Sequence, residues 1–250
     1  MTSCAHAGTE AATQHYLVAF DDTDNLETIG TGHVLDHFLH SIPGSFTYIT
    51  RHQLFVNELV PYTSHNSAMC AELETAIPFD KLVELAGQFL EAESAEGSDP
   101  GLCIAKMEHI SEPELLVEWG LRAKAEVLDK QAAYALATRC SVHLSEHGGD
   151  GQGVVGALAG VGLRLSGNDG RVRGKAHVGP GRMTVRELLA ATGFKRVCDL
   201  DGTVLPDDTE VELVQRQVKA IYRDSCSTVP VKRTPDGSFC TLGKDELRAL

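Results

Sequence analysis

The chain lacks the features that mark membrane and secreted proteins. None of its apolar runs reaches the roughly 18 residues that a transmembrane helix needs. Residues 1–14 contain no Lys or Arg and no apolar stretch, which excludes a secretory signal, and we expect them to form a disordered leader. We therefore predict a cytoplasmic protein of one large domain or two small ones, long enough at 250 residues to bury a core.

Cysteine is not arranged for disulfides or for zinc. The seven cysteines are an odd number, are widely scattered and include no C-x-x-C pair. Disulfide scaffolds are denser in cysteine, and structural zinc sites normally use paired ligands. Reduced thiols, mostly buried, are the expectation, and this agrees with a cytoplasmic location.

Basic residues are scarce in the first 100 residues, where 15 Asp and Glu face only Arg51 and Lys81. The other 150 residues carry 20 charges of each sign, so the net charge of −13 arises in the N-terminal part. Basic residues then gather between Arg164 and Arg196, a segment with only Asp169 and Glu187 as acids. An acidic lobe beside a basic segment suits a metal and phosphate site better than a nucleic-acid surface, for which a strongly basic domain is typical.

The first half of the chain reads as strand, helix, strand, strand, helix, strand. The predicted elements are residues 16–20, 31–40, 45–56, 66–76, 78–90 and 101–107. This order is ferredoxin-like. The predicted fold class is therefore α+β (mixed α/β), with a ferredoxin-like βαββαβ part followed by a Gly-rich α/β part.

The second half is expected to be helical first and then rich in short strands. The predicted elements are two helices within 113–138 broken near Asp129, a strand at 142–144, a Gly-rich loop and helix over 147–162, paired strands at 164–165 and 171–178, and a helix at 184–192 capped by Thr184. The predicted domains are the leader 1–14, a ferredoxin-like acidic lobe 15–110, a Gly-rich α/β lobe 111–197, and short strands and a tail at 198–250 packing on the lobes. The site is expected between the lobes.

An acidic turn follows the first strand. Asp21, Asp22 and Asp24 are three carboxylates within four residues, and their repulsion costs stability unless a cation offsets it. Carboxylate oxygens of this kind suit Mg²⁺, and the spacing is not that of a calcium-binding EF-hand loop. The alternative is a solvated turn in which a carboxylate caps neighbouring backbone.

Two glycine-containing segments are candidates for phosphate binding. Thr28–His33 places hydroxyls and glycines at a helix N-terminus, where amides and the helix dipole can hold an anion, although a helix cap by Thr28 or Thr31 is the alternative. Gly148–Gly162 can bring backbone amides to phosphates or simply allow close helix packing. The lysine of a P-loop is missing from the first segment.

Two further patterns are interpreted as structural. Asp199–Thr203 matches the D-x-D-G-T motif of haloacid-dehalogenase-type phosphatases, but it stands too late in the chain for that fold, and a turn is expected. His33 and His37 lie four residues apart on one predicted helix and can face one site, but they show no zinc spacing, so core or surface positions are favoured.

Four short blocks carry a resemblance to a known family. They are Asp21–Asp24 followed by Gly30-Thr31, then Pro61–Ala68, Asp99-Pro100-Gly101 and Gly151–Ala159. In this order they resemble the I-D-D-T-D signature and its threonine, the P-(Y/W)-K-T-R-G-N-G-A segment, the N-P-G turn and the G-R-G-(V/I)-I-G-A-L-A stretch of tRNA-Ile agmatinylcytidine synthetases. The blocks cover roughly residues 16–200.

The resemblance implies ATP and Mg²⁺ as cofactors. The family activates the C2 carbonyl of a wobble cytidine with a phosphate from ATP and then displaces the phosphate with agmatine. By this resemblance Asp21, Asp22 and Asp24 hold Mg²⁺ and the ATP phosphates, and Thr31 falls on the threonine that is autophosphorylated in the family. The predicted catalytic residues are Asp22 and Thr31, and the predicted nucleotide- or substrate-binding residues are Gly30, Asn66, Gly151, Gln152 and Gly153.

The chain also departs from the family pattern. Thr63–Ser67 lacks the arginine and both glycines of the matching segment, and Gly30 replaces a cysteine. The OB-fold and zinc ribbon that handle RNA in the family are not expected, because no C-x-x-C pair is present and too little chain remains. Together with the acidic N-terminal part, these departures argue against tRNA as the substrate.

Three functions follow as alternatives. The first is a kinase- or ligase-like enzyme that uses Mg-ATP to phosphorylate or activate a small molecule. The second is a nucleotide-binding module that regulates a partner without turnover, and the third is an RNA-modifying subunit that needs a partner chain. The predicted partners are ATP and a small-molecule substrate; nucleic acid and membranes are not expected, and a homodimer is left open.

Overall fold

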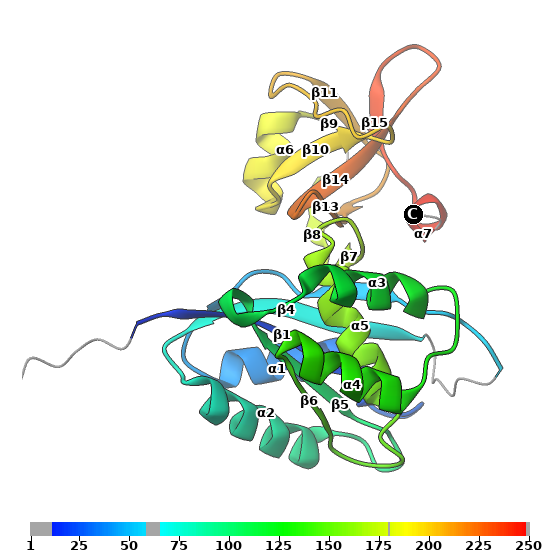
Figure 1. Cartoon of the computed structure of the whole chain (residues 1–250). Coiled ribbons are helices and arrows are strands. Elements are labelled where there is room, and N and C mark those ends of the chain that lie inside the picture. Colours follow the sequence, from blue (N-terminus) through cyan, green and yellow to red (C-terminus); the bar gives the residue numbers. More distant parts are fainter. Residues whose placement is uncertain (1–11, 59–65, 180, 249–250) are drawn as a thin grey trace, which may run out of the picture.

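The computed structural model describes residues 12–58, 66–179 and 181–248 (Figure 1). Its N-terminal part is built on an antiparallel sheet in the order β6–β5–β1–β4–β3. These strands are β1 (Gln14–Asp21), β3 (Thr50–Gln53), β4 (Ser67–Thr75), β5 (Gly101–Lys106) and β6 (His143–Glu146), and the short β2 (Ser45–Phe46) also pairs with β4. The α+β class is confirmed, and the sheet order is the one expected of the predicted β-α-β-β-α-β unit.

β1 is apolar from Tyr16 to Phe20, where it is covered on both faces. Alternate side chains of a strand point to opposite sides of the sheet. Tyr16, Val18 and Phe20 enter one hydrophobic cluster, whereas Leu17 and Ala19 enter another. This double burial ends at Asp21, so the acidic turn begins directly at the edge of the core.

Two helices cover the first face of the sheet. They are α1 (Thr31–Ser41) and α2 (Phe79–Glu93), whose buried Phe38 and Leu82 pack with Phe20 and Leu102 of the strands. The rings of Phe20 and Phe38 are 5.5 Å apart between centroids. This packing holds the N-terminus of α1 next to the end of β1.

Three helices cover the second face. They are α3 (Pro113–Ala123), α4 (Lys130–Cys140) and the small-residue helix α5 (Gly153–Leu165) (Figure 1). α3 and α5 approach closely: a Cβ at Gly162 would lie 1.8 Å from the carbonyl oxygen of Leu116. Asp129 begins α4 as its N-cap and accepts a hydrogen bond from the amide of Ala132.

The C-terminal part is a β-rich unit with a core of its own, which includes Val185, Leu188, Val211 and Val231. It contains α6 (Val185–Thr192), which begins with a capping box formed by Thr184 and Glu187.

One short helix, η1 (Met107–His109), follows β5 in the N-terminal part. The other elements, all after α5, are β7 (Arg171–Val172), β8 (Ala176–His177), β9 (Gly181–Thr184), β10 (Arg196–Asp199), β11 (Glu210–Leu213), β12 (Gln217–Val218), β13 (Ile221–Arg223), β14 (Cys226–Arg233), β15 (Phe239–Thr241) and α7 (Lys244–Arg248).

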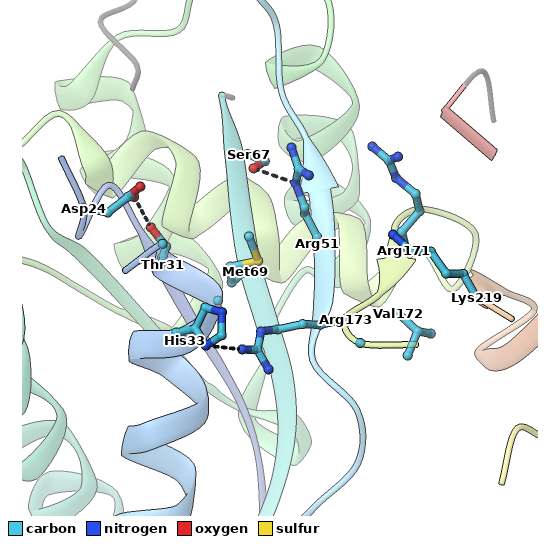
Figure 2. Close-up of a pocket in the computed structure, with 13 residues that line it drawn as sticks. Asp24, Thr31, His33, Arg51, Ser67, Met69, Arg171, Val172, Arg173 and Lys219 are labelled. Carbon is cyan, nitrogen blue, oxygen red and sulfur yellow. Dashed lines mark hydrogen bonds between the residues drawn. The ribbon is translucent and has the colours of Figure 1, made fainter. Parts of the chain in front are cut away.

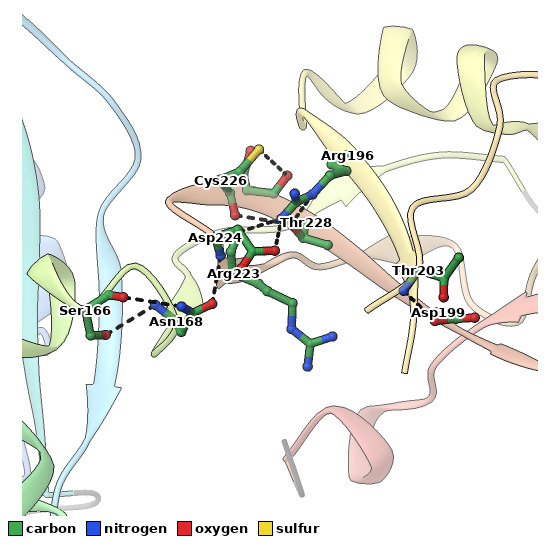
Figure 3. Close-up of polar contacts among 10 residues, drawn as sticks. Ser166, Asn168, Arg196, Asp199, Thr203, Arg223, Asp224, Cys226 and Thr228 are labelled. Atoms are coloured by element: carbon green, nitrogen blue, oxygen red, sulfur yellow. Dashed lines mark hydrogen bonds and ion pairs between the residues drawn. The ribbon is translucent and has the colours of Figure 1, made fainter. Parts of the chain in front are cut away.

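β7 joins the two parts of the chain. It pairs with β3 of the N-terminal sheet and with β13 of the C-terminal unit. A polar network supports the joint (Figure 3): the side-chain oxygen of Asn168, just after α5, accepts from the amide of Asp224 at 2.9 Å. Asp224 also accepts from Arg196 at 3.0 Å, which fixes the β13–β14 turn against β10.

Two of the three cores group residues across the predicted domain boundaries, one across residue 110 and the other across residue 197. Helices α3, α4 and α5 complete the core on the N-terminal sheet, and the predicted boundary at 197 falls within β10. The core of the C-terminal unit begins at Val178.

One local prediction is wrong. Arg164 and Leu165 are not a strand but the end of α5. The guanidinium of Arg164 is buried because it stacks on the rings of Tyr48 and Tyr222 and donates to backbone and hydroxyl oxygens, including Thr50 Oγ1 at 3.2 Å. These partners come from distant segments, so the helix can continue through an arginine.

The segment Asp199–Thr203 forms a turn after β10, as predicted. In this turn the side chain of Asp199 accepts a hydrogen bond from the amide of Thr203 at 2.8 Å (Figure 3). Across residues 12–58, 66–179 and 181–248, no helix has the length and apolar character needed to cross a membrane.

The close contact between α3 and α5 predicts a strong effect of a single methyl group. Gly162→Ala should lower the free energy of unfolding by about 1–3 kcal/mol, because the added Cβ overlaps the α3 backbone. Urea unfolding followed by circular dichroism measures this change. Gly179→Ala is the matched control, since no atom lies within 4 Å of a Cβ there. A gain of about 1 kcal/mol in the Gly162 variant, as helix propensity alone gives, would contradict the packing.

Candidate functional site

The acidic turn at the end of β1 is partly buried: Asp21 is buried, whereas Asp22 and Asp24 are partly exposed. The carboxylate of Asp21 lies directly over α5, where a Cβ at Gly156 would come within 1.7 Å of Oδ2. Gly156 is therefore required for this approach. Burial, followed by the charges of Asp22 and Asp24, raises the pKa of Asp21 well above its ordinary value.

Asp22 carries the next carboxylate and has an unusual backbone. Its φ of +51° lies in the left-handed region, which is uncommon for a residue other than glycine. Burial, then the charges of Asp99 and Asp24, raise the pKa of Asp22 to about 6, while the amide of Asp99 donates to it and opposes the shift. The turn therefore concentrates negative charge at the edge of the core.

Asp99 joins the acidic turn to the Gly-rich loop. Its side chain accepts hydrogen bonds from the amides of Asp150 and Gly151, the second at 3.2 Å, and its carbonyl accepts from Gly153 at 3.1 Å. The amides of Gly151 and Gly153, expected to face phosphates, thus donate to Asp99 in this structure. Gln152 is exposed and lies next to these bonds.

Thr31 stands at the first position of α1 and is almost fully buried. Its hydroxyl donates to Asp24 Oδ1 at 2.9 Å and accepts from the amide of Thr23 at 3.3 Å. Gly30, the N-cap, provides no side-chain cap, and the first amides of any helix lack partners within the helix. Thr31 and Gly30 therefore combine a hydroxyl with a site that attracts anions.

A pocket of about 310 Å³ opens in front of Thr31 (Figure 2). Asp24, Gly30 and Thr31 form one end of it, and Arg51, Arg171 and Lys219 stand at the opposite end. The other lining residues are Gly32, His33, Ser67, Met69, Val172, Arg173 and Gly174. The pocket thus has one acidic and one basic end, which suits a ligand that carries both a metal and anionic groups.

Arg173 is the basic residue nearest to α1. It donates to His33 Nδ1 at 2.8 Å and pairs with Asp36 at 3.3 Å. Gly32 allows this approach, because a Cβ there would lie 3.0 Å from the Arg173 side chain. His33 lines the pocket, whereas its predicted companion His37 is exposed and does not.

Asn66 has a structural contact in place of an open site. Its side-chain nitrogen donates to the carbonyl of Phe55 at 2.7 Å and ties the start of β4 to the chain after β3. Ser67 beside it lines the pocket and accepts from Arg51 at 3.0 Å. Thr63, Ser64 and His65 of the predicted segment lie outside the described residues.

Metal ligands are not preassembled in the part of the chain that the structure describes. No group of three or more His, Cys, Asp or Glu side chains there is arranged to hold a metal ion. Thr23 Oγ1, between Asp22 and Asp24, is nevertheless a buried oxygen with no hydrogen-bond partner among the described residues.

The residues that sequence reasoning missed are Asp99 and the basic end of the pocket. Asp99 stands in one of the four family-like blocks. Two signals for the basic end were available: Arg51 is one of two basic residues in an acidic segment, and Arg171 belongs to the basic run. Neither signal indicates that these residues meet, because β3 and β7 are far apart in the chain.

Comparisons with known proteins agree with this geometry at the level of the fold. No protein-family model and no curated protein matches the chain. A solved structure of apo TiaS, the tRNA-Ile agmatidine synthetase, is similar with a TM-score of 0.52 and 18% identity, covering 68% of this chain and 38% of that chain. The chain shares its fold with part of TiaS. The resemblance seen in the sequence is thereby confirmed as a relation of fold.

Other solved structures extend the comparison. A complex of TiaS with its tRNA and ATP has a TM-score of 0.51 and 18% identity, covering 78% of this chain and 50% of that chain. A tRNA fluorescent labeling enzyme has a TM-score of 0.53 and 20% identity, covering 69% and 42%. The chain spans half or less of the length of each of these proteins.

The raised pKa of Asp22 predicts a pH-dependent effect in metal-free buffer. The pKa of Asp22 is about 6 in the folded protein and 3.8 ordinarily, so folding favours the protonated carboxyl. The stability of the folded protein is therefore unaffected by this group below pH 3.8 and falls as the pH rises from 3.8 through 6. Asp22→Asn should therefore stabilise the protein at pH 7.5, on the order of 1 kcal/mol after allowance for solvent screening, and much less at pH 4.5. Thermal unfolding in EDTA at both pH values measures this. A variant that is equally stable or less stable at pH 7.5 would contradict the cost that burial and charge repulsion impose on the ionised Asp22.

Proposed function

We propose that the chain is an enzyme that uses Mg-ATP to transfer a phosphoryl group to a small substrate or to activate that substrate. The observation that carries this proposal is the Thr31 hydroxyl, bonded to Asp24 at a helix N-terminus that opens into a pocket with a basic wall. Phosphoryl transfer depends mainly on positioning and on the stabilisation of charge. The pocket offers both in one place.

The acidic turn fits a magnesium ion. Mg²⁺ usually takes one or two carboxylates together with water and substrate phosphates, so a complete protein cage is not required. We assign Asp22 and Asp24, which are partly exposed, as ligands, and we assign buried Asp21 to the electrostatic support of the ion. Thr23 Oγ1, which has no hydrogen-bond partner among the described residues, and the raised pKa of Asp22 fit a cation at this turn. The ion would supply positive charge to the phosphate oxygens.

Thr31 contacts the transferred phosphate or accepts it. Asp24 Oδ1, 2.9 Å from the hydroxyl oxygen, is placed to take the proton if Thr31 accepts the phosphoryl group. The amides at the start of α1, at the positive end of the helix dipole, would stabilise the negative charge on the phosphate. Gly30 is suited to this role because no side chain stands between the backbone and the ligand.

The comparisons support ATP and a small molecule as ligands. One similar structure is a complex of TiaS with tRNA, AMPCPP and agmatine, with a TM-score of 0.51 and 19% identity over 70% of this chain and 43% of that chain. Because the match covers part of that protein, its activity is not transferred as a whole. The Gly151–Gly153 loop remains a candidate for nucleotide contact only if the Asp99 bonds exchange on binding.

An RNA substrate is the second candidate. The tRNA complexes weaken the sequence-based expectation that nucleic acid is not a partner. Tight, salt-sensitive tRNA binding would favour this function, and the absence of binding at low salt would exclude it. A purely regulatory module is distinguished by nucleotide binding with no ADP or AMP formed across candidate substrates.

Calorimetric titration with a non-hydrolysable ATP analogue tests the proposed site. Binding should require Mg²⁺ and should weaken at least about tenfold in Asp22→Asn, because a metal ligand is lost; tenfold corresponds to about 1.4 kcal/mol. Thr31→Val should also weaken binding. It should lower the free energy of unfolding by about 1–3 kcal/mol, because the buried amide of Thr23 and the Asp24 carboxylate each lose a hydrogen-bond partner, so thermal unfolding must show that the variant is folded.

Asp201→Asn is the control for the loss of a carboxylate. Asp201 lies in the turn after β10, outside the pocket, and its substitution should leave binding unchanged. Equal binding with and without Mg²⁺, or equal binding by wild type and Asp22→Asn, would refute the site.

A further inference from the structure

Arg51 and Arg171 face each other across two paired strands. Arg51 of β3 and Arg171 of β7 are cross-strand partners in an antiparallel ladder. Side chains of such partners lie on the same face, and like charges directly opposite each other are destabilising. Figure 2 shows both guanidinium groups extending side by side at the basic end of the pocket. The pairing of β3 with β7, which connects the two parts of the chain, therefore holds two positive charges close together.

Lys219 adds a third charge to the same end of the pocket. It lies between β12 and β13 and lines the pocket with both arginines. Partial burial, followed by the charges of Arg171, Lys175, Lys244 and Arg51, lowers the pKa of Lys219. The positive charges are therefore close enough to disfavour one another.

Carboxylates do not offset the charges of Arg171 and Lys219 in the described part of the chain. Among the described residues, no acidic side chain lies within ion-pair distance of Arg171 or Lys219. Arg51 donates to the neutral side chains of Ser67 and Gln53. Arg173, in contrast, is paired with Asp36 at 3.3 Å, so it is not part of this cluster.

We propose that Arg51, Arg171 and Lys219 form a binding site for the anionic group, a phosphate monoester or a carboxylate, of a small second substrate. This inference rests on the proposed function, in which ATP is the first substrate. Arginine presents paired donors to such oxygens, and a lysine adds a mobile charge. A cationic amine would be repelled from the same wall.

The ATP phosphates belong to the other end of the pocket. Thr31, the α1 N-terminus and the acidic turn that suits the metal are there, while the three cations stand opposite in Figure 2. A pocket of about 310 Å³ is at the lower limit for small-molecule sites. A nucleic-acid chain would additionally have to approach the acidic N-terminal part, which has 15 Asp and Glu and two basic residues in its first 100 positions.

The test is a calorimetric titration with inorganic phosphate, and separately with acetate, in the presence of saturating Mg²⁺ and a non-hydrolysable ATP analogue. At least one anion should bind to wild type and bind at least about tenfold more weakly to the Arg171→Gln/Lys219→Gln double variant. Binding of phosphate alone identifies a phosphate monoester, and binding of acetate alone identifies a carboxylate. Thermal unfolding checks that the variant folds. Arg186→Gln is the control, because Arg186 is exposed in the same unit and pairs with Asp207.

Three results would overturn the proposal: neither anion binds, the double variant binds as wild type does, or the double variant loses the ATP analogue together with the anion. The third result would show that the wall holds nucleotide phosphates. Binding of a single-stranded oligonucleotide that depends on both residues, without binding of either anion, would also overturn it. If the ATP analogue does not bind to wild type, the proposed function fails, and the anion titration is repeated without the analogue. Anion binding by wild type that is lost in the double variant would then still support the anion site.

Discussion

The burial of β1 on both faces is the constraint on which the site depends. As the third of the five strands in the N-terminal sheet, β1 pairs with β4 on one side and β5 on the other, and helices cover both of its faces. After the apolar run Tyr16–Phe20, the chain becomes polar again at Asp21, where the strand ends. The carboxylates of the turn are therefore held against α5 and Asp99, where burial raises their pKa values.

The opposite end of the pocket carries a matching surplus of positive charge. β7 brings Arg171 opposite Arg51, and the C-terminal unit adds Lys219. Each end is unfavourable alone, because like charges lie close together. A ligand with a divalent cation at one end and anionic oxygens at the other offsets both costs, so the proposed function and the anion site follow from the same imbalance.

Local features of the fold could be predicted from the sequence. The apolar run before Asp21, the helical spacing after Gly30, the helix break near Asp129 and the cap at Thr184 depend on signals within a few residues, and each is present in the structure. Arg164 was misassigned because its burial depends on Tyr222, which no local pattern near the arginine indicates.

The site was predicted in part for the same reason. The acidic turn and Thr31 are adjacent in sequence and lie together in space. The basic wall depends on the pairing of β3 with β7 and on a loop of the C-terminal unit, so charge composition alone indicated the segment but not the pocket. Hydrogen bonds to Asp99 similarly occupy the amides of Gly151 and Gly153, which periodicity and glycine content do not indicate.

A crystal structure with Mg²⁺ and a non-hydrolysable ATP analogue would examine the proposed metal and nucleotide site in one step. We predict the metal on the carboxylates of Asp22 and Asp24, and the terminal phosphate at Thr31 and the first amides of α1. We also predict that Arg171 and Lys219 do not contact the nucleotide. A nucleotide bound elsewhere, or one whose phosphates lie on Arg171 and Lys219 with no metal at the acidic turn, would contradict this arrangement.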